Sequence, residues 1–216
     1  MKRMEVRYTA SIMKTSNDKA TWTGNSASIF EKVVDSSHFV REIYFYPSNR
    51  PEPVWLWVLG HEKASADKAL IDRVFSLRWV LHVCVGGKGY YNGQPVKRGT
   101  CFLSWPYFKH SIVADPNDPF EFYWVILRGD KMIDFVCENG FRSAQMMFEL
   151  DNLDQIETLF ELGLSANYND VDVYEYTMSL VKMLFSFHRK GEGFDTEYDK
   201  KTEYGRNYGS MARQLL

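Results

Sequence analysis

The sequence is poor in cysteine and has no cluster of basic residues, and each absence excludes a class of protein. Three cysteines in 216 residues are an odd number, and their spacing fits neither a disulfide framework nor a metal site. Cys84, Cys101 and Cys137 lie in apolar runs, so we expect buried free thiols in a reducing compartment. The net charge is −2 and the basic residues are scattered, so the chain lacks the basic surface of a nucleic-acid-binding domain.

Long hydrophobic runs are also absent. No segment approaches the roughly 18 consecutive apolar residues of a membrane-spanning helix. The N-terminal stretch "MKRMEVRYTASIMKTSNDK" has no apolar core of the kind found in secretion signals. With 45% hydrophobic residues the chain can bury one sizeable core. We therefore expect a cytoplasmic protein without membrane contact.

Common catalytic motifs are missing as well. The sequence has no G-x-S-x-G nucleophile elbow, and no cysteine lies beside a histidine at motif spacing. The only G-x-G of interest, Gly87-Lys88-Gly89, continues into "YYNG", which predicts a hairpin rather than a phosphate-binding loop. The sequence gives no reason to expect a cofactor.

What is present, in residues 54–127, is the pattern of β structure. Short runs of β-branched and aromatic residues are separated by turn residues every eight to twelve positions or so. Asn92-Gly93 predicts a type I′ hairpin turn, because that turn needs positive φ at both central positions. Gly99 predicts a second turn, Pro106 ends the following strand, and His110 begins another. The pattern predicts a small sandwich or barrel.

Both flanks of this region differ from it. Residues 1–25 are polar and aperiodic and predict an arm, and "SASIFEKVV" from Ser26 predicts about two turns of helix. After residue 130 helical spacing predominates. It predicts one helix from an N-cap at Asp151 to a stop at Gly163, and a second over residues 171–188.

An ordered set of motifs spans residues 81–129. In chain order these are Leu81-His82, Gly87-Lys88-Gly89, Asn92-Gly93, Gly99, Pro106, His110, Ala114-Asp115 and Pro119 to Trp124. The set resembles the N-terminal cupin-like effector domain of AraC/XylS-type bacterial transcription regulators. This resemblance implies a mostly β fold with C-terminal α structure, a cupin-like (jelly-roll) β-barrel followed by a helical hairpin.

The resemblance also implies how the chain is divided. We expect an arm and a short helix over residues 1–50, the barrel over 51–129, a helical dimerisation element over 130–190, and a linker with the start of another helix over 191–216. The family continues into helix-turn-helix motifs, so the chain is expected to be a sensor fragment of a longer regulator. DNA would be bound only through the absent domain.

The same resemblance implies a ligand-sensing and dimerisation function. The barrel would bind a small polar effector, expected to be a carbohydrate, and the chain would be neither an enzyme nor dependent on a cofactor. Two alternatives stay open, a cupin-fold sugar-modifying enzyme and a ligand-free dimerisation module with a solid barrel. The enzyme is disfavoured because metal cupins use an H-x-H pair, whereas neither His82 nor His110 has a second histidine two residues away.

Strand alternation selects the expected ligand-binding residues. In "EFYWVIL", Phe122 and Trp124 share one face, and in "RWVLHVCVGG", Arg78, His82 and Cys84 do. The resemblance places Trp124 where sugar-sensing relatives stack a tryptophan on a pyranose, and it matches a family histidine to His110. The expected set is Trp124, His82, His110, Phe122, Cys84 and Arg78.

Each of these assignments has an alternative. Trp124 and His82 are also compatible with ordinary core positions, and His110 with a structural role in its turn. Arabinose-sensing relatives carry an arginine before the G-x-G, where this chain has Gly86-Gly87. Arg78 or a group from the N-terminal arm would have to replace that charge.

The second helix carries two apolar stripes, of which the first consists of Val173, Tyr176, Thr177, Leu180, Leu184 and Phe187. Tyr174, Met178, Val181 and Phe185 follow at i, i+4, i+7 and i+11 beside the first stripe. The resemblance suggests that this face pairs with a second copy to form a homodimer. The alternative is that both stripes pack within one chain.

Overall fold

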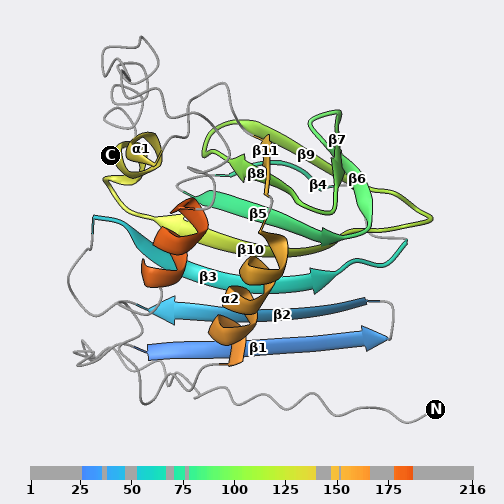
Figure 1. The fold of residues 1–216 in the computed structure, drawn as a ribbon, viewed down its shortest axis with the longest axis horizontal. Coiled ribbons are helices and arrows are strands. Elements are labelled where there is room, and N and C mark those ends of the chain that lie inside the picture. Colours follow the sequence, from blue (N-terminus) through green and yellow to red (C-terminus); the bar gives the residue numbers. More distant parts are fainter. Residues whose placement is uncertain are drawn as a thin grey trace, which may run out of the picture.

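Two antiparallel sheets and a group of helices make up the described part of the protein (Figure 1). The computed structural model describes residues 26–35, 38–46, 53–66, 71–75, 78–139, 147–150, 152–165 and 178–186. The fold is mostly β with helices late in the chain, a cupin-like jelly-roll arrangement, as the sequence predicts. Among the described residues, none of the helices has the length and apolar character needed to span a bilayer.

The larger sheet has seven strands in the order β1-β2-β3-β10-β5-β8-β11. These are β1 (Ser26–Asp35), β2 (His38–Tyr46), β3 (Trp55–Lys63), β10 (Glu121–Arg128), β5 (Trp79–Gly86), β8 (Thr100–Ser104) and β11 (Met147–Glu149). The smaller sheet has four strands in the order β4-β9-β6-β7. These are β4 (Ile71–Val74), β9 (Lys109–Ala114), β6 (Lys88–Tyr91) and β7 (Gln94–Lys97).

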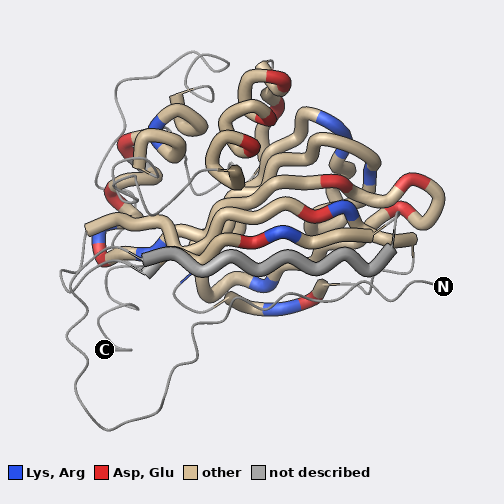
Figure 2. Tube along the Cα trace, turned by 90° about the horizontal axis from the view of Figure 1, so that it is seen from below, with Lys and Arg blue, Asp and Glu red and all other residues tan. Residues whose placement is uncertain are grey.

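The large sheet is the middle of three layers. Helices α1 (Met132–Glu138) and α2 (Leu153–Ser165) and the helical residues 178–186 lie together on one side of the sheets (Figure 2). A larger core joins these helices to the large sheet, and a second core fills the space between the two sheets. Both faces of the central strands are therefore covered, which explains why β5 is apolar on both faces.

The predicted turns are present. Asn92 and Gly93 have φ of 49° and 77° and connect β6 to β7, as a type I′ turn requires. Gly99 has φ of 95° and precedes β8. That strand ends at Ser104, shortly before Pro106, and β9 begins one residue before His110.

The prediction of a short helix from Ser26 is wrong. Residues 26–35 form β1, which pairs with β2 from Ser26 opposite Tyr46 to Asp35 opposite His38. Two isolated turns of helix have little stability in water, whereas the β1–β2 hairpin is stabilised by pairing with β3 of the large sheet. The large sheet therefore begins before residue 51, and residues 1–25 lie outside the described residues.

The first predicted helix is confirmed as α2, but its C-terminal end differs from the prediction. The helix continues past Gly163 to Ser165. Gly163 is buried at a close approach, since a Cβ there would collide with Leu59 and Leu180. The carbonyl of Asn152 accepts the first helical hydrogen bond, from Ile156 at 3.2 Å, and the predicted cap Asp151 lies outside the described residues.

Two further elements interrupt the region predicted to be helical. Helix α1 follows β10 directly, and β11 adds an edge strand beside β8. Within the second predicted helix, residues 178–186 are helical, and residues 171–177 and 187–188 lie outside the described residues.

Candidate functional site

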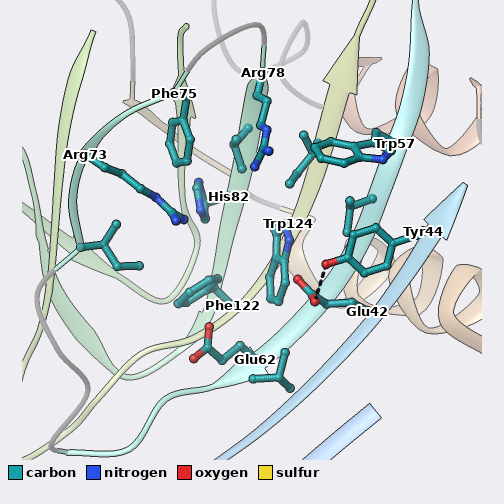
Figure 3. A pocket seen from close by; sticks show the side chains of 15 residues that line it. Glu42, Tyr44, Trp57, Glu62, Arg73, Phe75, Arg78, His82, Phe122 and Trp124 are labelled. Atoms are coloured by element: carbon teal, nitrogen blue, oxygen red, sulfur yellow. Dashed lines mark hydrogen bonds between the residues drawn. The ribbon is translucent and has the colours of Figure 1, made fainter. Parts of the chain in front are cut away.

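A cavity of about 280 Å³ lies between the large sheet and β4 (Figure 3). Strands β2, β3, β5 and β10 provide one wall, and residues of β4 and its flanks provide another. The lining side chains combine aromatic rings with groups of both charges. They are Val40, Glu42, Tyr44, Trp57, Val58, Glu62, Ile71, Arg73, Phe75, Arg78, Val80, His82, Phe122, Trp124 and Ile126.

Trp124 lies at the centre of the sheet wall. Its neighbours across the strands are Gly60 on β3 and His82 on β5. The ring centroids of Trp124 and Phe122 are 5.6 Å apart, and Phe122 in turn meets the edge of His82 at 5.5 Å. The indole is only 7% exposed, so the cavity presents a largely buried aromatic surface.

Trp57 reaches the cavity because of a β-bulge. The pairing of β10 with β3 shifts between Ile126, opposite Val58, and Leu127, opposite Leu56. Trp57 is the extra residue, so two consecutive side chains, Trp57 and Val58, line the cavity. A bulge of this kind redirects a side chain that regular alternation would place on the other face.

Two arginines form the basic end of the cavity. The guanidinium of Arg78 lies 4.5 Å from the ring of Trp57, and that of Arg73 lies 4.6 Å from the ring of Phe75. Burial lowers the pKa of Arg73, and the charge of Arg78 lowers it further. The two cations therefore lie close enough to repel each other.

Two carboxylates form an acidic region in another part of the lining. Glu42 accepts a hydrogen bond from the Tyr44 hydroxyl at 2.9 Å, and Glu62 lies 3.3 Å from the His38 ring. Burial raises the pKa of Glu42, the Tyr44 hydrogen bond opposes this, and the charge of Glu62 adds to the rise. The cavity is therefore bipolar, with Trp124 between its two ends (Figure 3).

Four of the six predicted binding residues meet at this cavity. Trp124, Phe122, His82 and Arg78 all line it. His82 is buried, with its ring stacked on Phe102 at 4.5 Å. Their role in ligand binding stays a prediction, but the structure brings the four together.

His110 lies one layer behind the cavity. Its Nε2–H donates to the Trp105 carbonyl at 2.6 Å, because a carbonyl can only accept, and its Nδ1 accepts from the Tyr91 hydroxyl at 2.7 Å. The ring stacks on Phe75, which does line the cavity. Burial lowers the pKa of His110, although the bond to Trp105 opposes the shift. The residue supports the wall without lining the cavity.

Cys84 shares the face of His82 but lies outside the cavity, in the core between the sheets. Its thiol donates to the Gly86 carbonyl at 3.3 Å. Burial raises the pKa of this thiol to about 12.

Three of the four residues predicted to pair with a second copy are buried within this chain. Met178, Val181 and Phe185 are buried in the larger core, and Tyr174 lies outside the described residues. The exposed large apolar side chain of this helical segment is Met183, at 43%. At these three positions no surface is free to contact a second copy. Pairing through the predicted stripe remains a prediction.

Several lining residues were not predicted from the sequence. Glu42 and Tyr44 come from β2, Glu62 and Trp57 from β3, and Arg73 from β4. The alternation of "VREIYF" in β2 could have placed Glu42 and Tyr44 on one face. Nothing in the sequence marks the bulge that redirects Trp57.

On the opposite face of the same strands, a polar network joins the sheet to α2. The Tyr123 hydroxyl donates to Glu161 at 2.7 Å, and Arg41 pairs with the same carboxylate at 2.7 Å. His61 stacks on Tyr123 and lies 3.0 Å from Glu121. Within the described residues, no three His, Cys, Asp or Glu side chains converge as a metal site would require.

Comparison with known families identifies the middle of the chain. Residues 58–161, from β3 to α2, match the family model of the AraC-like ligand binding domain. This region is an AraC-like ligand-binding domain. No curated protein sequence matches the chain.

Several solved structures are similar to this chain. Oxalate decarboxylase of Bacillus subtilis shares 15% identity over 59% of this chain and 32% of its own, with a TM-score of 0.35. YhaK of Escherichia coli shares 16% over 61% and 56%, with a TM-score of 0.35. The AraC-like transcriptional activator CuxR shares 7% over 83% and 60%, with a TM-score of 0.41. The chain thus spans about a third of the length of the oxalate decarboxylase, 32%.

Proposed function

We propose that this chain is the effector-sensing part of an AraC-type transcription regulator and that its cavity binds a small carbohydrate-like molecule. The observation that carries the proposal is the buried indole of Trp124, which forms a cavity wall between charged groups. An indole offers a broad apolar plane to the C–H face of a sugar ring. Carboxylates and guanidinium groups around it are suited to the ring hydroxyls.

The size of the cavity supports a ligand of about one sugar ring. Pockets for small molecules usually measure about 300–1,000 Å³, and 280 Å³ is just below this range. The lining is more polar than that of most such sites, because charged side chains and His82 share it with the aromatic and aliphatic ones, and this suits a ligand rich in hydroxyls. A monosaccharide therefore suits the cavity better than a larger oligosaccharide.

Signal output would pass through the large sheet to the helices. Residues of β10 alternate between the cavity and α2, so Trp124 faces the ligand and Tyr123 bonds to Glu161. A ligand that binds one arrangement of sheet and helices more tightly than another would shift their populations. We propose that this shift, in a homodimer, changes how attached DNA-binding domains are presented, and that the chain catalyses no reaction.

A thermal-shift screen tests the proposal. The chain is melted with single monosaccharides, with and without a chelator, because a ligand of the folded state raises its melting temperature. A rise with one sugar is expected in the unaltered chain and in the control Tyr90→Leu, whose ring is 50% exposed on β6, but not in Trp124→Leu.

Other outcomes would contradict the proposal. A shift that Trp124→Leu leaves unchanged would remove the cavity as the binding site. A shift abolished by the chelator would favour a metal enzyme, and no shift with any sugar would favour a ligand-free dimerisation module.

A further inference from the structure

Two guanidinium groups face the cavity, and within the described part of the chain neither forms an ion pair with a carboxylate. Arg73 belongs to β4 and Arg78 directly precedes β5, and Figure 3 shows both side chains pointing into the cavity near His82. Among the described residues, the arginines in ion pairs are Arg41 and Arg98. Both of those bind carboxylates on α2, at 2.7 and 2.8 Å. Within the described residues, Arg73 and Arg78 have no such ion pair, and neither has Arg128, which lies over the same Trp57 ring as Arg78.

Aromatic rings, rather than anions, hold these arginines in place. Arg78 and Arg128 both lie over the Trp57 ring, at 4.5 and 3.7 Å, and Arg73 lies over Phe75. Stacking occupies the flat face of a guanidinium and leaves its N–H edge available. That edge matches the two oxygens of a carboxylate or phosphate.

The positive charges also act on one another. Burial lowers the pKa of Arg73 and of Arg128, and the charge of Arg78 lowers both further. Like charges held together in a partly buried site cost free energy, which a bound anion would recover. The arrangement is therefore better suited to a charged ligand than to an empty or neutral one.

The acidic region fixes which way round such a ligand would lie. In Figure 3, Trp124 lies between Glu42 and Arg78, and Phe122 lies between Glu62 and Arg73. The two carboxylates contact Tyr44 and His38. Carboxylates repel an anionic group and accept hydrogen bonds from hydroxyls. The anionic end would meet the arginines, the hydroxyls would meet the carboxylates, and the ring would lie on Trp124.

We propose that the effector is a sugar that carries an anionic group, a carboxylate or a phosphate, held by Arg73 and Arg78. This inference rests on the proposed sensing function and adds a charge requirement to it.

Calorimetric titration of the full chain at low salt tests the inference with three probes of one ring size. D-glucuronate carries a carboxylate, D-glucose 6-phosphate a phosphate, and D-glucose neither. We expect at least one anionic probe to bind about tenfold or more tightly than glucose, and its affinity to fall with added salt. The tighter of the two identifies the anionic group.

Arginine variants assign the effect to the cavity. Arg73→Gln and Arg78→Gln should each weaken the anionic probe roughly ten- to hundredfold, as expected for a hydrogen-bonded charge, and leave glucose nearly unchanged. Arg78→Lys keeps the charge and should lie between. Arg98→Gln is the matched control, because Arg98 pairs with Asp154 and Glu157 on α2, and thermal melting of every variant confirms folding.

Two results would overturn the inference in distinguishable ways. In the first, glucose binds as tightly as both anions and Trp124→Leu abolishes all binding. This result would refute the charge requirement and leave the sensing function in place. Failure of all three probes, together with failure of every neutral sugar in the thermal-shift screen, would refute both.

Discussion

Gly60 and Trp124 face each other across the β3–β10 pair, and the indole ring fills the space that a side chain on Gly60 would need. A Cβ built on Gly60 would overlap Cε2 and Cζ2 of Trp124. Such a close approach of backbone to ring is available only to glycine. The absent side chain therefore allows the indole to form the wall of the cavity.

Gly60→Ala should displace the indole and destabilise the fold. Overpacking of a buried site costs about 1–3 kcal/mol, and urea unfolding would measure this loss in free energy of unfolding. In a Trp124→Leu background the same Gly60→Ala change should cost clearly less, since the clashing ring is gone. Equal costs in the two backgrounds would show that the two residues are not coupled.

Tyr123→Phe tests the connection between the sheet and α2. The Tyr123 hydroxyl donates to Glu161 at 2.7 Å, whereas the ring packs on Phe160 at 4.7 Å and would be kept by phenylalanine. We expect a loss of about 1 kcal/mol in free energy of unfolding, because the Glu161 side chain is 47% exposed and solvent weakens the bond. Hydrogen exchange should accelerate in α2 more than in β6. Tyr90→Phe, on the exposed Tyr90, is the control.

The same bond should lose strength in acid. Burial alone would raise the pKa of Glu161, but hydrogen bonds from Tyr123 and Arg41 and the charge of Arg41 bring it below the ordinary value of 4.5. A carboxylate with a lowered pKa adds stability above its unfolded pKa and loses it as the pH falls through the folded value. The difference between the unaltered chain and Tyr123→Phe should therefore shrink below about pH 4.5. A difference that is constant with pH would contradict this account.

Local turn signals were the reliable part of the sequence. Asn92-Gly93 and Gly99 need backbone conformations that few residues tolerate, so their identity alone predicts the turn. Trp124 and Phe122 were placed together by simple alternation. Alternation also placed Cys84 on the same face as His82. Strand β5 is longer than the cavity, however, and Cys84 packs in the core between the sheets instead of lining the cavity.

Other features depended on contacts far apart in the chain. The residues from Ser26 to Val34 have a spacing compatible with a helix, and only pairing with β2 makes them a strand. Strand β2 is covered on both faces, with Ile43 in the larger core and Tyr44 at the cavity, so its sequence lacks a clear polar side. The bulge at Trp57 arises from the register of β3 on β10, which no single segment encodes.

Protonation of His110 should destabilise the protein below neutral pH. Burial lowers the pKa of His110 from the ordinary 6.5. As the pH falls below 6.5, the imidazole is therefore protonated in the unfolded chain before it is protonated in the folded chain. The stabilising contribution is complete above about 6.5 and is lost as the pH falls. Urea unfolding at several pH values should show a steeper loss for the unaltered chain than for His110→Gln. Parallel curves for the two would mean that His110 titrates normally when folded.

The two described cysteines should be chemically inert in the folded protein. Burial raises the pKa of Cys84 to about 12 and that of Cys101 well above its ordinary value, and the attacking species in thiol chemistry is the thiolate. At about pH 8, near the ordinary thiol pKa of about 8.5, a disulfide reagent should therefore label neither, although all three cysteines of the chain should react in denaturant. Cys137→Ser makes the test strict, because the native variant should then show no fast-reacting thiol. Rapid labelling of that variant would mean that β5 or β8 opens readily, and the cavity wall that β5 provides would then be less rigid than its packing indicates.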